Sequence, residues 1–144
     1  LCLYSPDLKL FISGDQVLPR ISSNVSVFPT EPDADPLTDW IDSLNSIAKQ
    51  VPDDVLVLPA HNLPFRGLHG RLAHLVRGHE RALTRLHEAL TQPMRAVDAF
   101  SALFKRPIGG EMLGLATGEA IAHFNCLIAR GLARSSTDDK GIVW

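Results

Sequence analysis

The sequence is poor in several features, and each shortage excludes a class of protein. Of its 144 residues two are cysteines and one is tyrosine, and the formal net charge is only −2. Two distant cysteines cannot form the disulfide scaffold that stabilises small secreted domains, so we expect free thiols in a reducing compartment, the cytoplasm. No apolar run approaches the roughly 18 residues that cross a bilayer, so we expect no membrane span.

The composition is otherwise that of a globular chain. Hydrophobic residues make up 45% and charged residues 21%, which excludes disorder, collagen and coiled coil for the whole chain. Charge is uneven: residues 1–65 hold three basic and nine acidic side chains, whereas residues 66–90 hold five arginines and two glutamates. The chain opens in strand-like alternation without a signal-peptide pattern, which favours the latter part of a longer protein.

The first segments of the chain favour a hairpin followed by a long loop. Residues 1–4 and 8–12 are β-prone and are separated by a turn-forming Ser-Pro-Asp cluster, which predicts two paired strands. Residues 16–36 are polar and rich in proline, with one short strand expected at Val25 to Phe28. Loops of this length in compact domains are often functional.

From residue 38 onward the apolar residues recur mainly at helical spacing. Apolar residues at helical spacing predict amphipathic helices over 38–50 and 68–90, and the apolar run 55–58 between them suits a buried strand. Arg77, Arg81 and Arg85 fall on the face opposite the apolar residues of the second helix. We therefore expect an α/β fold.

The remainder of the chain predicts short helices and a final hairpin. Pro93 suits the first turn of a helix, one or two further helices cover roughly 111–130, and Gly131 ends them. The inward face of the last helix is expected to consist of four apolar residues: Ile121, Phe124, Leu127 and Ile128. A terminal hairpin is expected at Leu132 to Trp144, and a domain boundary near residue 91 divides 1–90 from 91–144.

Asp15 and His61 are the two candidates for chemistry. Each follows the carboxyl end of a predicted strand, the edge at which α/β folds usually bind ligands. Carboxylate oxygen and imidazole nitrogen are ordinary ligands for zinc and related metals. The residues alone also allow a simpler interpretation, in which Gly14-Asp15 is a turn and His61 a hydrogen-bonded loop histidine.

A resemblance bears on that choice. The run Leu10-Phe11-Ile12-Ser13-Gly14-Asp15 resembles the strand and Gly-Asp step of metallo-β-lactamase-fold hydrolases, and Val57 to Pro64 is similar to their later Pro-Gly-His segment. The resemblance implies that Asp15 bridges two metal ions and that His61 binds the second. It also implies the C-terminal half of an αββα sandwich (1–90) and, at 91–144, the small winged-helix-like extension of a glyoxalase II-like branch.

The sequence departs from this family in two ways. Ala60 and Asn62 stand where the family commonly has glycine, and Leu63 moves the following proline one residue further on. The family's main metal motif, His-x-His-x-Asp-His, is absent. We therefore expect the C-terminal half of a longer hydrolase, inactive alone, with its N-terminal half as the partner that completes the site.

The resemblance also implies cofactors and a reaction for the intact enzyme. It would hold two divalent ions, zinc or alternatively iron or manganese, and use metal-bound hydroxide to attack an ester, thioester, lactone or phosphodiester. A small-molecule ester or thioester is the expected substrate. Arg66 and His69 are candidates for contacting an anionic substrate at the mouth of the site, or else simply form a charged loop-to-helix junction.

Other interpretations of the same residues stay open. The tail and the stripe Arg77, Arg81 and Arg85 could bind nucleic acid or process RNA, although such a stripe is usually a solvated face. The tail could also pack on the catalytic part or form a homodimer through Phe100, Phe104 and Trp144. His79 and His123 are expected to be buried structural residues, and His74 and His87 to be exposed.

Overall fold

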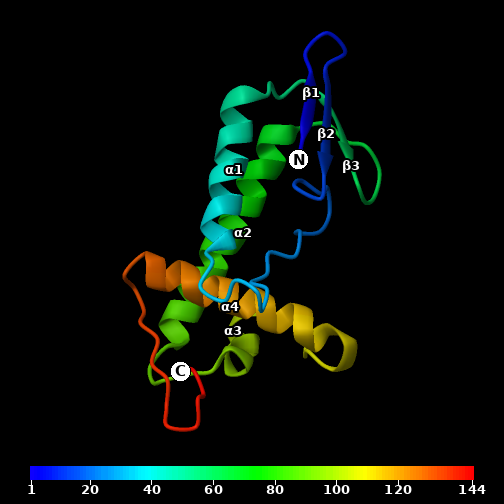
Figure 1. Ribbon diagram of the computed structural model, residues 1–144. Coiled ribbons are helices and arrows are strands. Elements are labelled where there is room, and N and C mark those ends of the chain that lie inside the picture. Colours follow the sequence, from blue (N-terminus) through cyan, green and yellow to red (C-terminus); the bar gives the residue numbers. More distant parts are fainter. The chain divides into compact units, whose positions relative to one another are not determined.

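The computed structural model describes residues 1–144 and contains one small sheet and several helices. Strands β1 (Leu3–Ser5), β2 (Leu10–Gly14) and β3 (Leu56–Pro59) lie in the order β1-β2-β3 (Figure 1). β1 and β2 are antiparallel, as the predicted hairpin requires, and β2 and β3 are parallel. The α/β class expected from the sequence is confirmed.

Both faces of this sheet carry apolar side chains, but only one face is buried. Phe11 of β2 and its parallel partner Val57 are 1% and 0% exposed and form part of the core. On the other face Leu3 and Ile12 pair across β1 and β2 and are 56% and 46% exposed. A sheet that meets water on one face normally carries polar residues there. The outer face of this sheet is apolar and uncovered in the chain.

The predicted helices over 38–50 and 68–90 are present as α1 (Pro36–Gln50) and α2 (Leu68–Ala89). In the first turn of each helix one backbone N–H donates to a carboxylate. In α1 Thr38 donates to Asp35 at 3.1 Å, and in α2 His69 donates to Asp53, which precedes β3, at 2.6 Å. Such caps satisfy N–H groups that a helix leaves without partners in its first turn. The leucines that predicted the inner face of α2 are buried: Leu68, Leu72, Leu75, Leu83 and Leu86.

The chain divides into two compact units. Unit 1 consists of Leu1–Ser23 and Asp39–Gly78, and it holds the sheet. Unit 2 consists of Asn24–Thr38 and His79–Trp144. These units do not coincide with 1–90 and 91–144, because α2 contributes residues to both. The division of the sequence into two domains near residue 91 stays a prediction.

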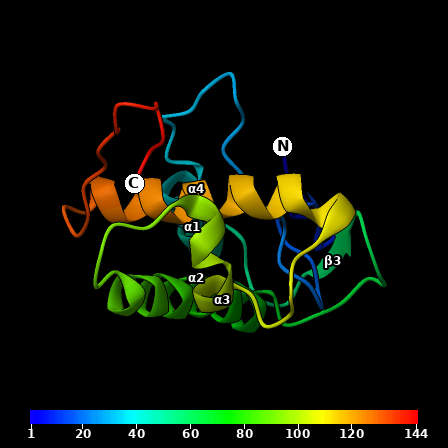
Figure 2. The ribbon, with the colours of Figure 1, turned by 90° about the horizontal axis from the view of Figure 1, so that it is seen from below.

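Unit 2 contains α4 (Leu113–Ala129) and three shorter helices, η1 (Ala96–Ala99), α3 (Phe100–Leu103) and η2 (Gly110–Met112). Figure 2 shows α3 beside α4, and the two helices are in contact. Pro93 precedes η1 by three residues and is not in a helical first turn, which corrects the expectation for that position. The helix begins instead at Ala96, where the Asp98 carboxylate accepts the backbone N–H of the preceding Arg95 at 3.2 Å.

Two expected β-structures are reduced or absent in unit 2. Residues 25–28 form no strand, although Val25 and Val27 are buried, because the Val27 N–H bonds the Gly118 carbonyl of α4 at 3.1 Å rather than a strand partner. The terminal hairpin contains one isolated bridge, between Thr137 and Val143. Its turn is as expected, with the Gly141 N–H bonded to the Asp138 carbonyl at 3.0 Å.

The buried face of α4 is made of smaller residues than expected. Of the four residues expected there Leu127 is buried, Ile121 and Phe124 are only half-buried and Ile128 is exposed. The rest of the buried face consists of smaller or polar residues: Ala116, Ala120, Ala122, His123 and Cys126. The backbone of 26–27 lies so close to this helix that a Cβ on Gly118 would be 2.9 Å from the Val27 oxygen. Only small side chains allow such an approach.

By length and composition alone, the segment Gly110–Ala129 could cross a membrane. The mean hydropathy of its best window is 1.3, and 39% of that window is buried in the chain. Glu111 and Glu119 interrupt the apolar run of this segment. Core helices of globular proteins meet the same criteria, so one such helix is weak evidence for a span, and the absence of a membrane stays a prediction.

Candidate metal-binding edge of the sheet

Unit 1 brings Asp15 and His61 together. Asp15 follows β2 and His61 follows β3, and because these strands are parallel their carboxyl ends lie at one edge of the sheet. The His61 Nε2 atom is 3.3 Å from Asp15 Oδ1. The two loops are also joined through the backbone, since the Ala60 N–H donates to the Gly14 carbonyl at 3.0 Å.

A residue with a left-handed backbone conformation lies next to each of Asp15 and His61 and turns the chain there. Gly14, immediately before Asp15, has φ +54°, and Asn62, immediately after His61, has φ +70°. Glycine adopts this conformation without cost and asparagine tolerates it better than most residues. The Asn62 that departs from the family's glycine is therefore compatible with a sharp turn beside His61.

The separation of the two donors suits a divalent metal. Two zinc bonds of about 2.1 Å at the tetrahedral angle would place their donor atoms about 3.4 Å apart, close to the 3.3 Å found here. Both side chains are about two-thirds exposed, 68% for Asp15 and 65% for His61. Two donors with open access therefore fit part of a metal site.

The chain alone does not supply a full ligand set. No group of three or more histidine, cysteine, aspartate or glutamate side chains is placed to hold one metal ion. Structural zinc sites have four protein ligands and catalytic sites usually have three. Asp15 and His61 make up at most half of such a set.

Arg66 and His69 lie elsewhere in unit 1. The backbone turns back after His61, so that Phe65 pairs antiparallel with Val57 and the chain returns toward the start of β3. There Arg66 donates to the Asp54 carbonyl at 2.8 Å, and the His69 ring is 2.8 Å from the Val51 oxygen. The structure does not bring these side chains beside Asp15 and His61, and their contact with substrate stays a prediction.

Unit 2 contains a second histidine arrangement that the sequence did not predict as a pair. His79 of α2 and His123 of α4 are 7% and 1% exposed, and their Nδ1 and Nε2 atoms are 3.3 Å apart. Burial lowers the pKa of His79 to about 4, and it also lowers that of His123. The expectation of two buried structural histidines is met, and their pairing is new.

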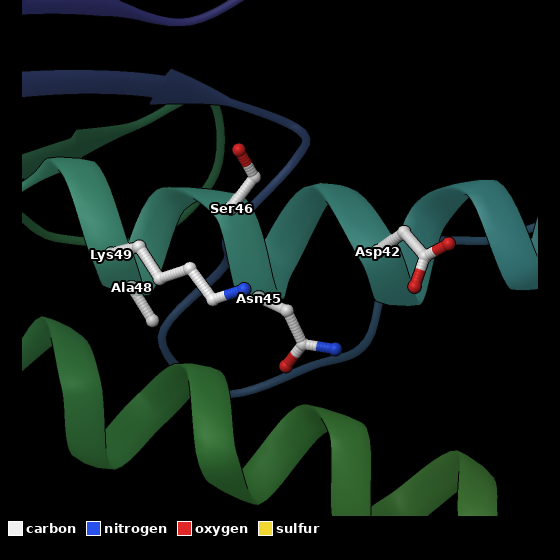
Figure 3. Close-up of a pocket in the computed structure, with 5 residues that line it drawn as sticks. All are labelled: Asp42, Asn45, Ser46, Ala48 and Lys49. Carbon is white, nitrogen blue, oxygen red and sulfur yellow. The ribbon is translucent and has the colours of Figure 1, made fainter.

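One shallow hollow lies on the surface of α1. It is lined by residues of that helix alone, Asp42, Asn45, Ser46, Ala48 and Lys49, and Figure 3 shows the Lys49 ammonium directed toward Asn45 while Ser46 points away. Asp42 is its one carboxylate, and the Ser46 hydroxyl accepts a hydrogen bond from the Gln50 side chain at 2.6 Å. It contains none of the residues singled out from the sequence.

Comparison with known proteins agrees with the fold. Residues 83–144 match the family described as metallo-beta-lactamase-like, C-terminal domain. A crystal structure of a beta-lactamase domain protein from Burkholderia ambifaria is 39% identical, with a TM-score of 0.90 over 99% of this chain and 42% of that one. A metallo-beta-lactamase family protein from Thermus thermophilus is 22% identical, with a TM-score of 0.82 over 99% of this chain and 44% of that one. No curated protein sequence matches.

These findings confirm the coarser part of the resemblance. The chain has a metallo-beta-lactamase-like C-terminal domain, and metallo-beta-lactamase family proteins are its structural neighbours. It spans less than half the length of those solved structures. A metallo-beta-lactamase-like fragment is consistent with a hydrolase family, whose members typically bind divalent metals.

Proposed function

We propose that this chain is part of a metal-dependent hydrolase, in which Asp15 and His61 donate to a site for two divalent ions. The observation that supports this most is their convergence at one sheet edge, 3.3 Å apart and open to solvent. Zinc is the metal proposed, with iron or manganese as alternatives, and a small ester or thioester is the substrate proposed. When bound, such ions supply an activated water and polarise the substrate's reacting oxygen.

The two side chains would have different tasks. Asp15 Oδ1 faces His61, and the side chain is exposed to solvent, so its second oxygen would hold a second ion, as a bridging carboxylate does. His61 Nε2 is the nitrogen that faces Asp15, so this nitrogen must be unprotonated to donate to a metal. The hydrogen bond between the Ala60 N–H and the Gly14 carbonyl keeps the two donors in register.

Further ligands would come from polypeptide outside this chain. Three observations support that step: fewer than three donors converge here, the solved relatives are more than twice as long, and the outer sheet face around Leu3 and Ile12 is apolar and exposed. Burying such a face contributes roughly 25 cal/mol per Å² of apolar surface. A second layer of the same protein placed there would complete both the core and the ligand set.

Metal content tests the proposal directly. After zinc loading and dialysis we expect less than about 0.2 metal per chain in the 144 residues alone, because two donors bind weakly. Within a polypeptide of the relatives' full length we expect about two metals and hydrolysis of an ester or thioester. Asp15→Ala and His61→Ala should each lower the metal content and abolish most of the activity.

Matched controls separate loss of a ligand from general damage. Asp7→Ala removes an exposed carboxylate in the β1–β2 turn, and His74→Ala removes an exposed histidine of α2. Neither should change metal content. Full metal content in the long protein despite Asp15→Ala and His61→Ala would disprove the assignment of these two ligands.

Several narrower proposals rest on sequence alone. The glyoxalase II-like branch and a winged-helix-like tail belong with them, as do the inactivity of this chain alone and its cytoplasmic location. A homodimer through Phe100, Phe104 and Trp144 would need rings that are already engaged: Phe100 contacts Phe104 at 5.6 Å, and the Arg95 guanidinium is 5.8 Å from the centre of the Trp144 ring. Nucleic-acid binding through the arginine stripe is not favoured by the comparisons.

A further inference from the structure

The loop that carries Asp15, residues 15–23, is closed by its own hydrogen bonds. The Gln16 N–H donates to the Ser13 carbonyl at 3.0 Å, and the buried Ser13 hydroxyl donates to the Val17 carbonyl at 2.8 Å. At its far end the Ser23 hydroxyl donates to the carbonyl of Asp15 itself. Val17 and Leu18 anchor the loop in the core, at 0% and 3% exposed. A polar loop is thus held in one shape.

Two residues outside the loop hold it: Ser43 of α1, whose hydroxyl accepts from the Gln16 side chain at 2.5 Å, and Arg71, in the first turn of α2. The Arg71 Nε donates to the Leu18 carbonyl at 2.5 Å and its Nη2 to the Ile21 carbonyl at 2.7 Å. Arg71 forms no ion pair, so its charge is directed entirely at these loop carbonyls. Burial lowers the pKa of the guanidinium, which nevertheless stays protonated in proteins.

The shape of the guanidinium explains why arginine serves here. Nε and Nη2 lie in one plane on one edge of the group, so two N–H bonds leave in parallel and reach two acceptors at once. Leu18 and Ile21 are three residues apart, and their carbonyls meet this edge together only in one loop conformation. Lysine carries the same charge on a point-like ammonium and does not impose that geometry.

We propose that Arg71 is a positioning residue that fixes the 15–23 loop and thereby sets the place of the Asp15 carboxylate beside His61. The path is short: Arg71 holds Ile21, Ser23 lies two residues further on, and the Ser23 hydroxyl is bonded to the Asp15 carbonyl. The metal role of this positioning rests on the function proposed above. The mechanical role of Arg71 in the loop does not.

The test compares Arg71→Lys with Arg77→Lys in the whole chain. Arg77 lies on the same helix, is exposed and forms no hydrogen bond, so it matches the change without touching the loop. Hydrogen exchange of the backbone amides of 16–23 reports loop order. Zinc titration followed by the ring signals of His61 reports metal affinity, with Asp15→Ala as its reference, and urea unfolding reports the fold.

Arg71→Lys should accelerate exchange of the loop amides about tenfold, because a hydrogen bond to a charged group is lost. It should weaken zinc binding at His61 about tenfold, the usual effect of losing a residue that orients a ligand. Arg77→Lys should leave both unchanged, and the core amides should exchange at the same rates in all variants.

The outcomes separate the two proposals. Unchanged loop exchange in Arg71→Lys would overturn the positioning role, whatever happens to zinc. Faster loop exchange together with zinc binding that is unaffected by Asp15→Ala would support the positioning of the loop and contradict the metal site. Faster exchange throughout the chain in Arg71→Lys would also overturn the proposal, since it would mean a general loss of stability.

Discussion

The chain holds two pairs of side chains at the same separation in opposite surroundings. Asp15 and His61 in unit 1 are 3.3 Å apart and about two-thirds exposed, and His79 and His123 in unit 2 are also 3.3 Å apart but almost fully buried. Water can compete with the first pair and cannot reach the second. The same separation therefore occurs in an exposed pair, proposed above as part of a metal site, and in a buried structural contact, and the two pairs differ in their access to solvent.

The hydrogen-bond partners of His79 and His123 determine which ring nitrogens carry the protons. His123 Nδ1 is 2.8 Å from the Glu119 carbonyl oxygen, which can only accept, so Nδ1 carries the proton and Nε2 is an acceptor. His79 Nδ1 must then donate to that Nε2. Each imidazole is neutral and has a fixed tautomer. Asp15 and His61, by contrast, are open to solvent.

The largest expected effect comes from breaking the buried pair. His123→Ala removes a fully buried ring with two hydrogen bonds and leaves a cavity, and we expect a loss of about 3–4 kcal/mol in the free energy of unfolding. Urea unfolding followed by circular dichroism measures it. His74→Ala, an exposed histidine on α2, should change stability by less than about 0.5 kcal/mol. Equal effects in the two variants would mean that His123 is not a core residue.

The buried pair also shows where sequence reasoning reached its limit. The apolar periodicity of 68–90 placed His79 on the inner face of its helix, and the structure confirms its burial. The partner could not be predicted, because it depends on how α2 and α4 pack. On α4 a stripe of alanines together with Gly118 forms much of the buried surface, and of the four larger apolar residues expected there only Leu127 is buried.

The next largest effect is a loss of stability at acidic pH. The pKa of His79 is about 4 in the folded chain, below its ordinary value of 6.5, and that of His123 is also lowered. The unfolded chain therefore binds more protons between these values, so stability should fall as the pH is lowered from about 6.5 to 4. For His79 the loss amounts to about 3 kcal/mol. Urea midpoints measured across this range should drop, and a flat profile would contradict the buried pair.

Glu119 opposes this trend and gives a sharper version of the test. Burial raises its pKa from 4.5 to about 6, despite a hydrogen bond from Asn24. Its folded form therefore holds protons that the unfolded form releases, which favours the folded state as the pH falls from about 6 to 4.5. Glu119→Gln removes this compensation, so the acid loss of stability should become steeper. An unchanged slope would show that Glu119 does not titrate in this range.

A smaller effect is expected at Gly118, one turn before His123. A Cβ there would be 2.9 Å from both Ser26 Cβ and the Val27 oxygen, so Gly118→Ala should destabilise the chain by about 1–2 kcal/mol. Gly114 lies on the same helix with nothing within 4 Å of its Cβ position. Gly114→Ala should instead stabilise by up to about 1 kcal/mol, because alanine favours the helix. The two changes in opposite directions, measured by urea unfolding, would confirm the close packing of 26–27 on α4.

The exposed site was more predictable than the buried one. Asp15 and His61 each follow an apolar strand, and parallel strands end at one edge, so local pattern and one topological rule sufficed to bring them together. Arg66 and His69 were proposed for the same mouth from closeness in sequence, but the turn after His61 carries them to the start of β3. The role of Arg71 does not follow from the sequence, because it depends on how the 15–23 loop packs against α2.

The smallest expected effect is in the exposed pair itself. A double-mutant cycle with Asp15→Asn and His61→Gln, in the absence of metal, should give a coupling energy below about 0.5 kcal/mol, because solvent screens exposed charges and two mobile side chains must be ordered to meet. Thermal unfolding of the four proteins measures it. A large excess of zinc should slightly stabilise the unsubstituted chain and none of the substituted ones, since even a weak ligand raises stability when its concentration exceeds its Kd. A coupling above about 1 kcal/mol without metal would instead make the pair a structural ion pair. The contrast with His79 and His123 would then fail, because both pairs would serve to hold the fold.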